Sequence, residues 1–157
     1  MFIEIPNPHG KNIIVGTIYR PPNQNVSAFI EELNNILSII SKDNKNCYLM
    51  GDFNLDLLNY DQHTKTQDFL DALFSYMMIP LITRPTRVTA YSATLIDNIF
   101  TNCFSHNILS GNILNDFSNH FPIFAFFNNE YFLKYSEIKL SMRDFREEMV
   151  DWASVVT

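Results

Sequence analysis

Cys47-Tyr48-Leu49-Met50-Gly51-Asp52-Phe53-Asn54 is an apolar run that leads directly into a polar turn. Such a short run of nonpolar residues is typical of a buried strand. A second apolar, β-branched run covers residues 13–19, and a stretch with helical periodicity separates the two runs. Buried strands that alternate with amphipathic helices predict an α/β (α+β) fold, in which ligand sites lie at the ends of strands.

Two helices are predicted from the spacing of nonpolar residues. The first has Ser27 as its expected N-cap. Its apolar stripe follows the helical repeat and consists of Phe29, Ile30, Leu33, Ile36, Leu37 and Ile40. The second helix is expected to begin at Thr64-x-x-Gln67, a capping-box pattern, and Pro80 ends it.

Three more strands and a tail complete the predicted organisation. The strands are expected at residues 2–5, 95–101 and 121–127. Residues 128–140 are interpreted as a linker. Residues 141–157 are interpreted as a helical connector, because Ser141-x-x-Asp144 is cap-like and Phe145, Met149 and Trp152 share one helical face.

The composition excludes several classes of protein. A chain of 157 residues is one domain or part of one. A net charge of −6 excludes a basic coat for nucleic acid but leaves room for a local phosphate site. Two cysteines, Cys47 and Cys103, are no disulfide framework. Because no secretory leader and no membrane-length apolar run is present, we expect an intracellular protein without a membrane partner, whether nuclear or cytoplasmic.

Unusual polar residues concentrate in four short segments: Tyr19-Arg20-Pro21-Pro22, Gly51-Asp52-Phe53-Asn54, Thr94-Leu95-Ile96-Asp97-Asn98-Ile99-Phe100 and Ser118-Asn119-His120-Phe121-Pro122. Taken singly, Asp52 and Asn54 fit a turn and Tyr19 fits the core. Asp97 is different, because a carboxylate between nonpolar strand residues needs a partner, and His120 could supply it. Alone, His120 would be an ordinary neutral core histidine.

In this order, and with Pro85-Thr86-Arg87 added, the segments resemble the endonuclease/exonuclease/phosphatase superfamily. More narrowly, they resemble the endonuclease domain of non-LTR (LINE-type) retrotransposon proteins, over about residues 12–127. Gly-Asp-Phe-Asn alone is a weak match, whereas five ordered segments are a strong one.

The resemblance implies hydrolysis of phosphodiesters with Mg²⁺. Asp52 would orient or deprotonate the attacking water and, with Asn119, bind the metal. Asn54 would donate a hydrogen bond to the charge developing on the phosphate, to which Tyr19 would also donate. Asp97 would hold His120 in one tautomer, and His120 would contact a phosphate oxygen.

Two departures from the family pattern limit what the resemblance implies. Asn119 stands where the family has an aspartate, which replaces an anionic ligand by a neutral one. We also expect the amino-terminal half of the family fold, with its asparagine and its metal-binding glutamate, to be missing, since Glu4 fits the polar face of an edge strand. Residues 1–127 would then form the carboxyl-terminal portion of a two-sheet β-sandwich flanked by helices.

Two functional hypotheses follow. The first is a Mg²⁺-dependent DNA endonuclease of a retrotransposon, with DNA as partner and a reverse transcriptase domain in a longer polyprotein. The alternative is a truncated, catalytically incomplete remnant of that endonuclease. A phosphatase acting on small substrates is a third reading, favoured by the acidic charge but not by the Tyr-Arg-Pro-Pro and Pro-Thr-Arg segments.

Overall fold

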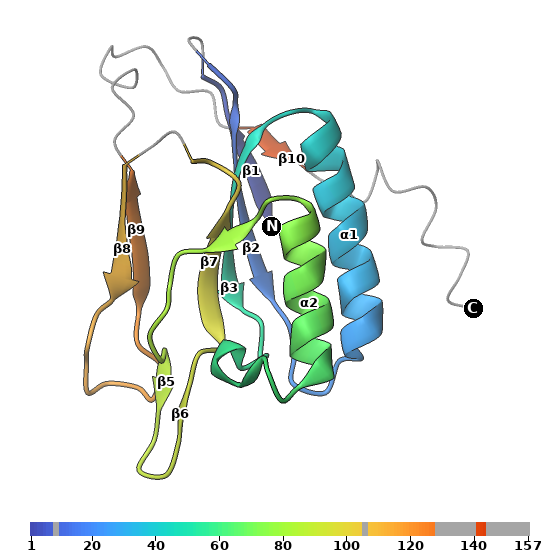
Figure 1. The fold of residues 1–157 in the computed structure, drawn as a ribbon. Helices are drawn as coiled ribbons and strands as arrows, with labels where there is room; N and C mark the ends of the chain where they lie inside the picture. Colours follow the sequence, from blue (N-terminus) through green and yellow to red (C-terminus); the bar gives the residue numbers. More distant parts are fainter. Residues whose placement is uncertain (8–9, 105–106, 128–140, 144–157) are drawn as a thin grey trace.

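A computed structural model describes residues 1–7, 10–104, 107–127 and 141–143. Their main feature is a six-stranded sheet with the strand order β10-β1-β2-β3-β7-β4 (Figure 1). The strands are β1 (Phe2–Ile5), β2 (Ile13–Tyr19), β3 (Asn46–Asp52), β4 (Ile79–Pro80), β7 (Asp97–Thr101) and β10 (Ser141–Arg143). Only the pairing of β2 with β3 is parallel among these neighbours, because helix α1 connects the two strands as a crossover.

Helices α1 (Val26–Lys42) and α2 (Thr64–Ser75) lie side by side on one face of this sheet (Figure 1). The predicted stripe of α1 is confirmed, since its buried residues are Phe29, Leu33, Leu37 and Ile40. They pack with the nonpolar residues of α2 and the sheet into one core. The prediction of Ser27 as the N-cap of α1 is wrong. Asn25 is the N-cap, and its Oδ1 accepts a hydrogen bond from the Ala28 N–H at 3.1 Å.

Helix α2 begins where expected, but without the predicted capping box. His63 is its N-cap residue, and Thr64 already lies inside the helix. The His63 Nδ1 atom lies 2.8 Å from the Thr66 hydroxyl, and Gln67 bonds back to the Asp61 carbonyl instead of the helix start. A short 3₁₀ helix, η1 (Leu57–Asn59), precedes α2. The helix ends at Ser75, and Pro80 belongs to β4.

A hairpin of β8 (Ile108–Asn112) and β9 (Ile123–Phe127) lies on the opposite face of the sheet (Figure 1). Its Phe127 ring stacks on the Tyr48 ring with a centroid distance of 4.6 Å, and its residues pack with Ile99. The hairpin covers this face only in part, because Thr17 and Tyr19 at one end of β2 are exposed. The predicted α+β class, a partial two-sheet sandwich flanked by helices, is confirmed.

Gly51 allows β3 to approach β2 at the end of their pairing. Its φ is 155°, and a Cβ atom at this position would lie 1.7 Å from the Ile18 carbonyl oxygen. No residue with a side chain fits there without moving the backbone. The glycine of Gly-Asp-Phe-Asn therefore brings the polar turn close to the end of β2.

The tail departs from the prediction at its first residues. Ser141–Arg143 form strand β10, antiparallel to β1, with Met142 opposite Ile3. Pairing with the open edge of β1 satisfies main-chain groups that a local helix would leave exposed at that edge. The rest of the predicted connector and the predicted linker, residues 144–157 and 128–140, lie outside the described residues. No helix within the described part is long and apolar enough to cross a membrane.

The structure contains short strands that the sequence pattern did not predict. Besides β4 and β8, they are β5 (Arg87–Val88) and β6 (Ala93–Thr94), which pair as a small hairpin. Strands β4, β5 and β6 have two residues each, too few for a periodic pattern, and β8 contains the polar residues Ser110 and Asn112 and Gly111, which weaken its strand pattern. The hairpin matters because residues at its base contact the candidate site.

Candidate active site

Strand register places three of the predicted residues in one row. Tyr19 of β2 is opposite Asp52 of β3, and Asp52 is opposite Asp97 of β7. Paired residues of adjacent strands project from the same face of a sheet. This is the face opposite the helices, because alternate residues of β3 such as Leu49 pack against the helices while Tyr48 packs against the β8–β9 hairpin.

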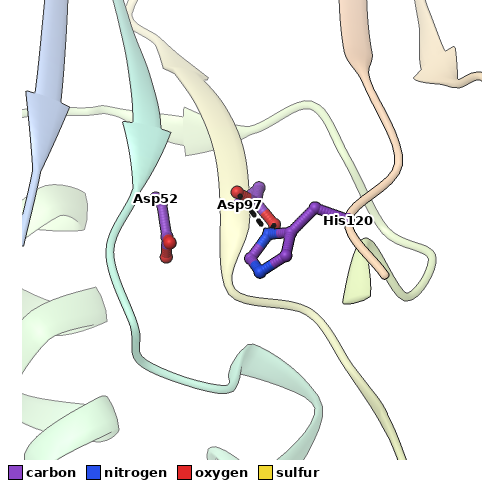
Figure 2. Close-up of side chains that lie close together, drawn as sticks. All are labelled: Asp52, Asp97 and His120. Atoms are coloured by element: carbon purple, nitrogen blue, oxygen red, sulfur yellow. Dashed lines mark hydrogen bonds and ion pairs between the residues drawn. The ribbon is translucent and has the colours of Figure 1, made fainter. Parts of the chain in front are cut away.

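Asp97 and His120 are in direct contact, as predicted (Figure 2). The His120 Nδ1 atom lies 3.1 Å from Asp97 Oδ2 and 3.4 Å from Oδ1. The Asp97 side chain is 16% exposed and that of His120 is 39% exposed. The contact engages Nδ1, so Nε2 is the ring nitrogen left to meet a ligand.

Thr86 fixes the orientation of Asp97. Its hydroxyl donates to Asp97 Oδ2 at 2.8 Å and accepts from the main-chain N–H groups of Asp97 and Ile96 at 3.0 and 3.3 Å. Thr86 is fully buried. Thr86 belongs to the Pro85-Thr86-Arg87 motif, and its role follows only from its contact with Asp97, 11 positions away.

The same segment holds the residues around His120 in place. The Phe121 N–H donates to the Thr86 carbonyl at 2.7 Å, and the Val88 N–H donates to the Asn119 carbonyl at 2.9 Å. Arg87 and His120 form an isolated antiparallel bridge. The segment Pro85-Thr86-Arg87 therefore positions both the Asp97 carboxylate and the main chain of His120.

Asp52 is the second carboxylate of the group. Burial raises its pKa above the ordinary value, and the negative charge of Asp97 acts in the same direction. The Asn54 N–H, which donates to Asp52 Oδ1 at 2.9 Å, opposes this shift, as do the charges of His120 and Arg87. A carboxylate with a raised pKa is a better proton acceptor near neutral pH.

Asn54 occupies a left-handed conformation with φ 49°, which asparagine tolerates better than most residues. Its side-chain Nδ2 donates to the Arg20 carbonyl at 2.8 Å. One of its two amide hydrogens is thus used within the protein, and the other remains for a ligand.

The side chains of two predicted site residues make no hydrogen bond to the group among the described residues. Tyr19 is 65% exposed, and among the described residues no hydrogen bond joins its side chain to Asp52. Asn119 is exposed as well, and its main-chain carbonyl, not its side chain, makes the hydrogen bond to Val88. Their predicted roles rest on position in the chain alone.

Asp52, Asp97 and His120 come from three distant segments, yet each offers a ligand atom within 4.8 Å of the others. They face a cleft of about 390 Å³ between β3, β7 and the start of β9. Its lining is formed by Met50, Gly51, Asp52, Asp97, Ile99, His120, Phe121, Pro122 and Ile123. Carboxylate oxygens are hard ligands, and Mg²⁺ uses one or two of them while keeping several waters, so the donor set fits this ion.

A family model described as endonuclease-reverse transcriptase matches residues 13–124. The chain belongs to this family, as the five motifs predicted. None of the curated proteins compared with the chain matches it.

Solved structures share the fold. The endonuclease domain of TRAS1, a telomere-specific non-LTR retrotransposon, has a TM-score of 0.59 and 15% identity, over 78% of this chain and 59% of that one. An endonuclease/exonuclease/phosphatase family protein from Leptotrichia buccalis C-1013-b has a TM-score of 0.58 and 18% identity, over 81% and 53%. A mutant beta toxin from Staphylococcus aureus with bound magnesium ions has a TM-score of 0.54 and 17% identity, over 79% and 56%. The chain thus spans little more than half the length of these structures.

Proposed function

We propose that the chain carries the site of a Mg²⁺-dependent DNA endonuclease of a non-LTR retrotransposon. The observation that carries this proposal is the convergence of Asp52, Asp97 and His120 within 4.8 Å at the wall of an open cleft. Family membership and the fold shared with a retrotransposon endonuclease domain support it. The proposed substrate is a DNA phosphodiester.

His120 and Asp97 form the phosphate-binding side of the proposed site. With Nδ1 held by Asp97, the imidazole presents Nε2 to a phosphate oxygen. Thr86 keeps Asp97 in this orientation. Asn54 and Tyr19 are proposed as further donors to the phosphate.

Asp52 forms the water-activating side of the proposed site. Its carboxylate orients the attacking water and accepts its proton. Asp52 and Asn119 would hold the ion, which when bound stabilises negative charge on the phosphate as a Lewis acid. Asn119 contributes a neutral oxygen where an aspartate would contribute a charge, so we expect weaker binding of Mg²⁺ than with Asn119→Asp.

A nicking assay on supercoiled plasmid tests this function. The chain should produce open-circular DNA with Mg²⁺ and none with EDTA. His120→Ala should lower the rate by about 10²–10³-fold, the range for loss of one positioned hydrogen-bond donor to developing charge. Asp71→Asn, at an exposed position of α2, is the control and should leave the rate unchanged. Nicking that survives EDTA or His120→Ala would refute the proposal.

A second candidate is a catalytically incomplete portion of such an endonuclease. The chain spans 53–59% of the length of the two endonuclease-family structures described above, and Asn119 replaces an anionic ligand. This candidate predicts no nicking by the chain alone and nicking by a longer polypeptide that contains it. It is wrong if both the chain and its Asn119→Asp variant nick DNA at the rate of the longer protein.

The proposed division of the chain follows the same hypothesis. Residues 1–127 would be endonuclease domain and residues 128–140 a linker, and the proposed connector of residues 141–157 would begin with strand β10, which pairs with β1. The connector would lead to a reverse transcriptase in a longer polyprotein, in keeping with the family description.

A further inference from the structure

Arg20 is a buried cation next to the candidate site, and nothing in the proposed chemistry yet uses it. It is only 2% exposed. Its Nε donates to the Phe53 carbonyl at 2.6 Å and its Nη2 to the Asn54 carbonyl at 2.8 Å. Its Nη1 donates to the carbonyls of Pro21 and Gln24 at 3.2 and 3.0 Å. Within the described residues, every hydrogen-bond acceptor of this guanidinium is a main-chain carbonyl.

The main chain of Arg20 is also hydrogen-bonded to the turn that contains Asp52 and Asn54. The Arg20 N–H donates to the Asp52 carbonyl at 2.9 Å, and the Arg20 carbonyl accepts from Asn54 Nδ2 at 2.8 Å. Asp52, Phe53 and Asn54 are therefore all bonded to this one residue. Asn54 in turn donates its N–H to the Asp52 carboxylate, so the contacts reach the reacting group itself.

We infer that Arg20 is a positioning residue of the active site: its guanidinium holds the turn that aims the Asp52 carboxylate and the Asn54 amide. The inference rests on the proposed function for its catalytic consequence. It explains why an arginine follows the strand in Tyr-Arg-Pro-Pro. The same hydrogen bonds hold the turn in which Asn54 has a φ of 49°.

Lysine should not replace Arg20 in this role. A guanidinium presents parallel donors in one plane, which match the successive carbonyls of Phe53 and Asn54. An ammonium is a point charge that reaches fewer of these acceptors at once. If Arg20 served only to fill the core, its replacement would lower the stability of the fold without a specific loss of the nicking rate.

The test compares Arg20→Lys and Arg20→Ala with Leu37→Ala, a core variant in α1 on the opposite face of the sheet. Plasmid nicking with Mg²⁺ is measured at a temperature where circular dichroism shows each variant folded. We expect Arg20→Lys to lower kcat by about 10–100-fold with KM little changed, since small misplacement of reacting groups has effects of that size. Added methylguanidinium should restore part of the rate of Arg20→Ala and none of that of Leu37→Ala.

Hydrogen exchange of the Asn54 amide is measured on the same proteins without substrate. Faster exchange at Asn54 in Arg20→Lys, but not in Leu37→Ala, supports the inference. Equal behaviour of the two variants in rate and exchange overturns it. If the unmodified chain does not nick DNA, the proposed function fails, and the positioning role of Arg20 is then judged from hydrogen exchange alone. Unchanged protection of the Asn54 amide in Arg20→Lys would overturn that role.

Discussion

At the scale of single residues, the site joins two carboxylates whose surroundings differ. Asp97 is bonded to Thr86 and His120, whereas Asp52 receives one main-chain N–H bond from Asn54. Burial raises the pKa of Asp52 with the help of the Asp97 charge. The two carboxylates are thus suited to different tasks, Asp97 to orienting the imidazole and Asp52 to accepting a proton.

The raised pKa of Asp52 predicts how stability depends on pH. The folded state holds the Asp52 proton more tightly than the unfolded state, so this contribution to stability is fully present below the ordinary pKa of 3.8 and is lost as pH rises through the folded-state value. Asn at this position cannot ionise. Asp52→Asn should therefore raise the melting temperature at neutral pH in EDTA, and the gain should vanish below pH 3.8.

Thermal unfolding at the two pH values measures this effect. Asp71→Asn, at an exposed position, serves as the control and should show no such trend. A melting temperature of Asp52→Asn that falls below that of the unmodified chain at neutral pH would show that the ionised carboxylate is favoured by its surroundings.

At the scale of elements, the segment around Thr86 connects β7 with the chain that leads into β9. Thr86→Val keeps the shape of the side chain but leaves the buried N–H of Ile96 and the partly buried N–H of Asp97 without this acceptor. The free energy of unfolding should fall by about 1–3 kcal/mol, the usual cost of an unsatisfied buried donor. The His120 ring signals in NMR should also shift, because Asp97 loses its orienting bond.

Thr101→Val is the matched control for this change. Thr101 is equally buried, and its hydroxyl donates to the Cys47 carbonyl and accepts from the Cys103 N–H. It lies at the other end of β7 from Asp97. Chemical denaturation should show a similar loss of stability, with the His120 signals unmoved. Equal shifts of His120 in both variants would contradict a specific role for Thr86.

Elements with a periodic pattern could be predicted from the sequence, and elements that depend on distant partners could not. The stripe from Phe29 to Ile40 marks α1 because every third or fourth residue meets the sheet. The cap was misassigned because Asn25 and Ser27 are both good cap formers. Strand β10 forms by pairing with β1, and no local pattern in Ser141–Arg143 reveals that edge.

At the scale of the whole molecule, the candidate site joins Asp97 to Asp52, 45 positions earlier in the chain, and to His120, 23 positions later. The sequence predicted the meeting of Asp97 and His120, because a carboxylate on a nonpolar strand requires a partner. The roles of Arg20 and Thr86 could not be predicted, since their hydrogen bonds reach residues 33 and 11 positions away. Tyr19 and Asn119 show the converse, because within the described residues their motif positions bring neither side chain into a hydrogen bond with the group.

Metal binding tests the central claim most directly, because it needs neither substrate nor a longer polypeptide. Mn²⁺ serves as a paramagnetic substitute for Mg²⁺, since both prefer carboxylate oxygens. Titrated into the isotopically labelled chain, it should first broaden the NMR signals of Asp52, Asp97 and His120, and Asp52→Asn should abolish this broadening. Broadening that begins elsewhere, or that persists in Asp52→Asn, would contradict the assignment of these three residues to one metal-dependent site.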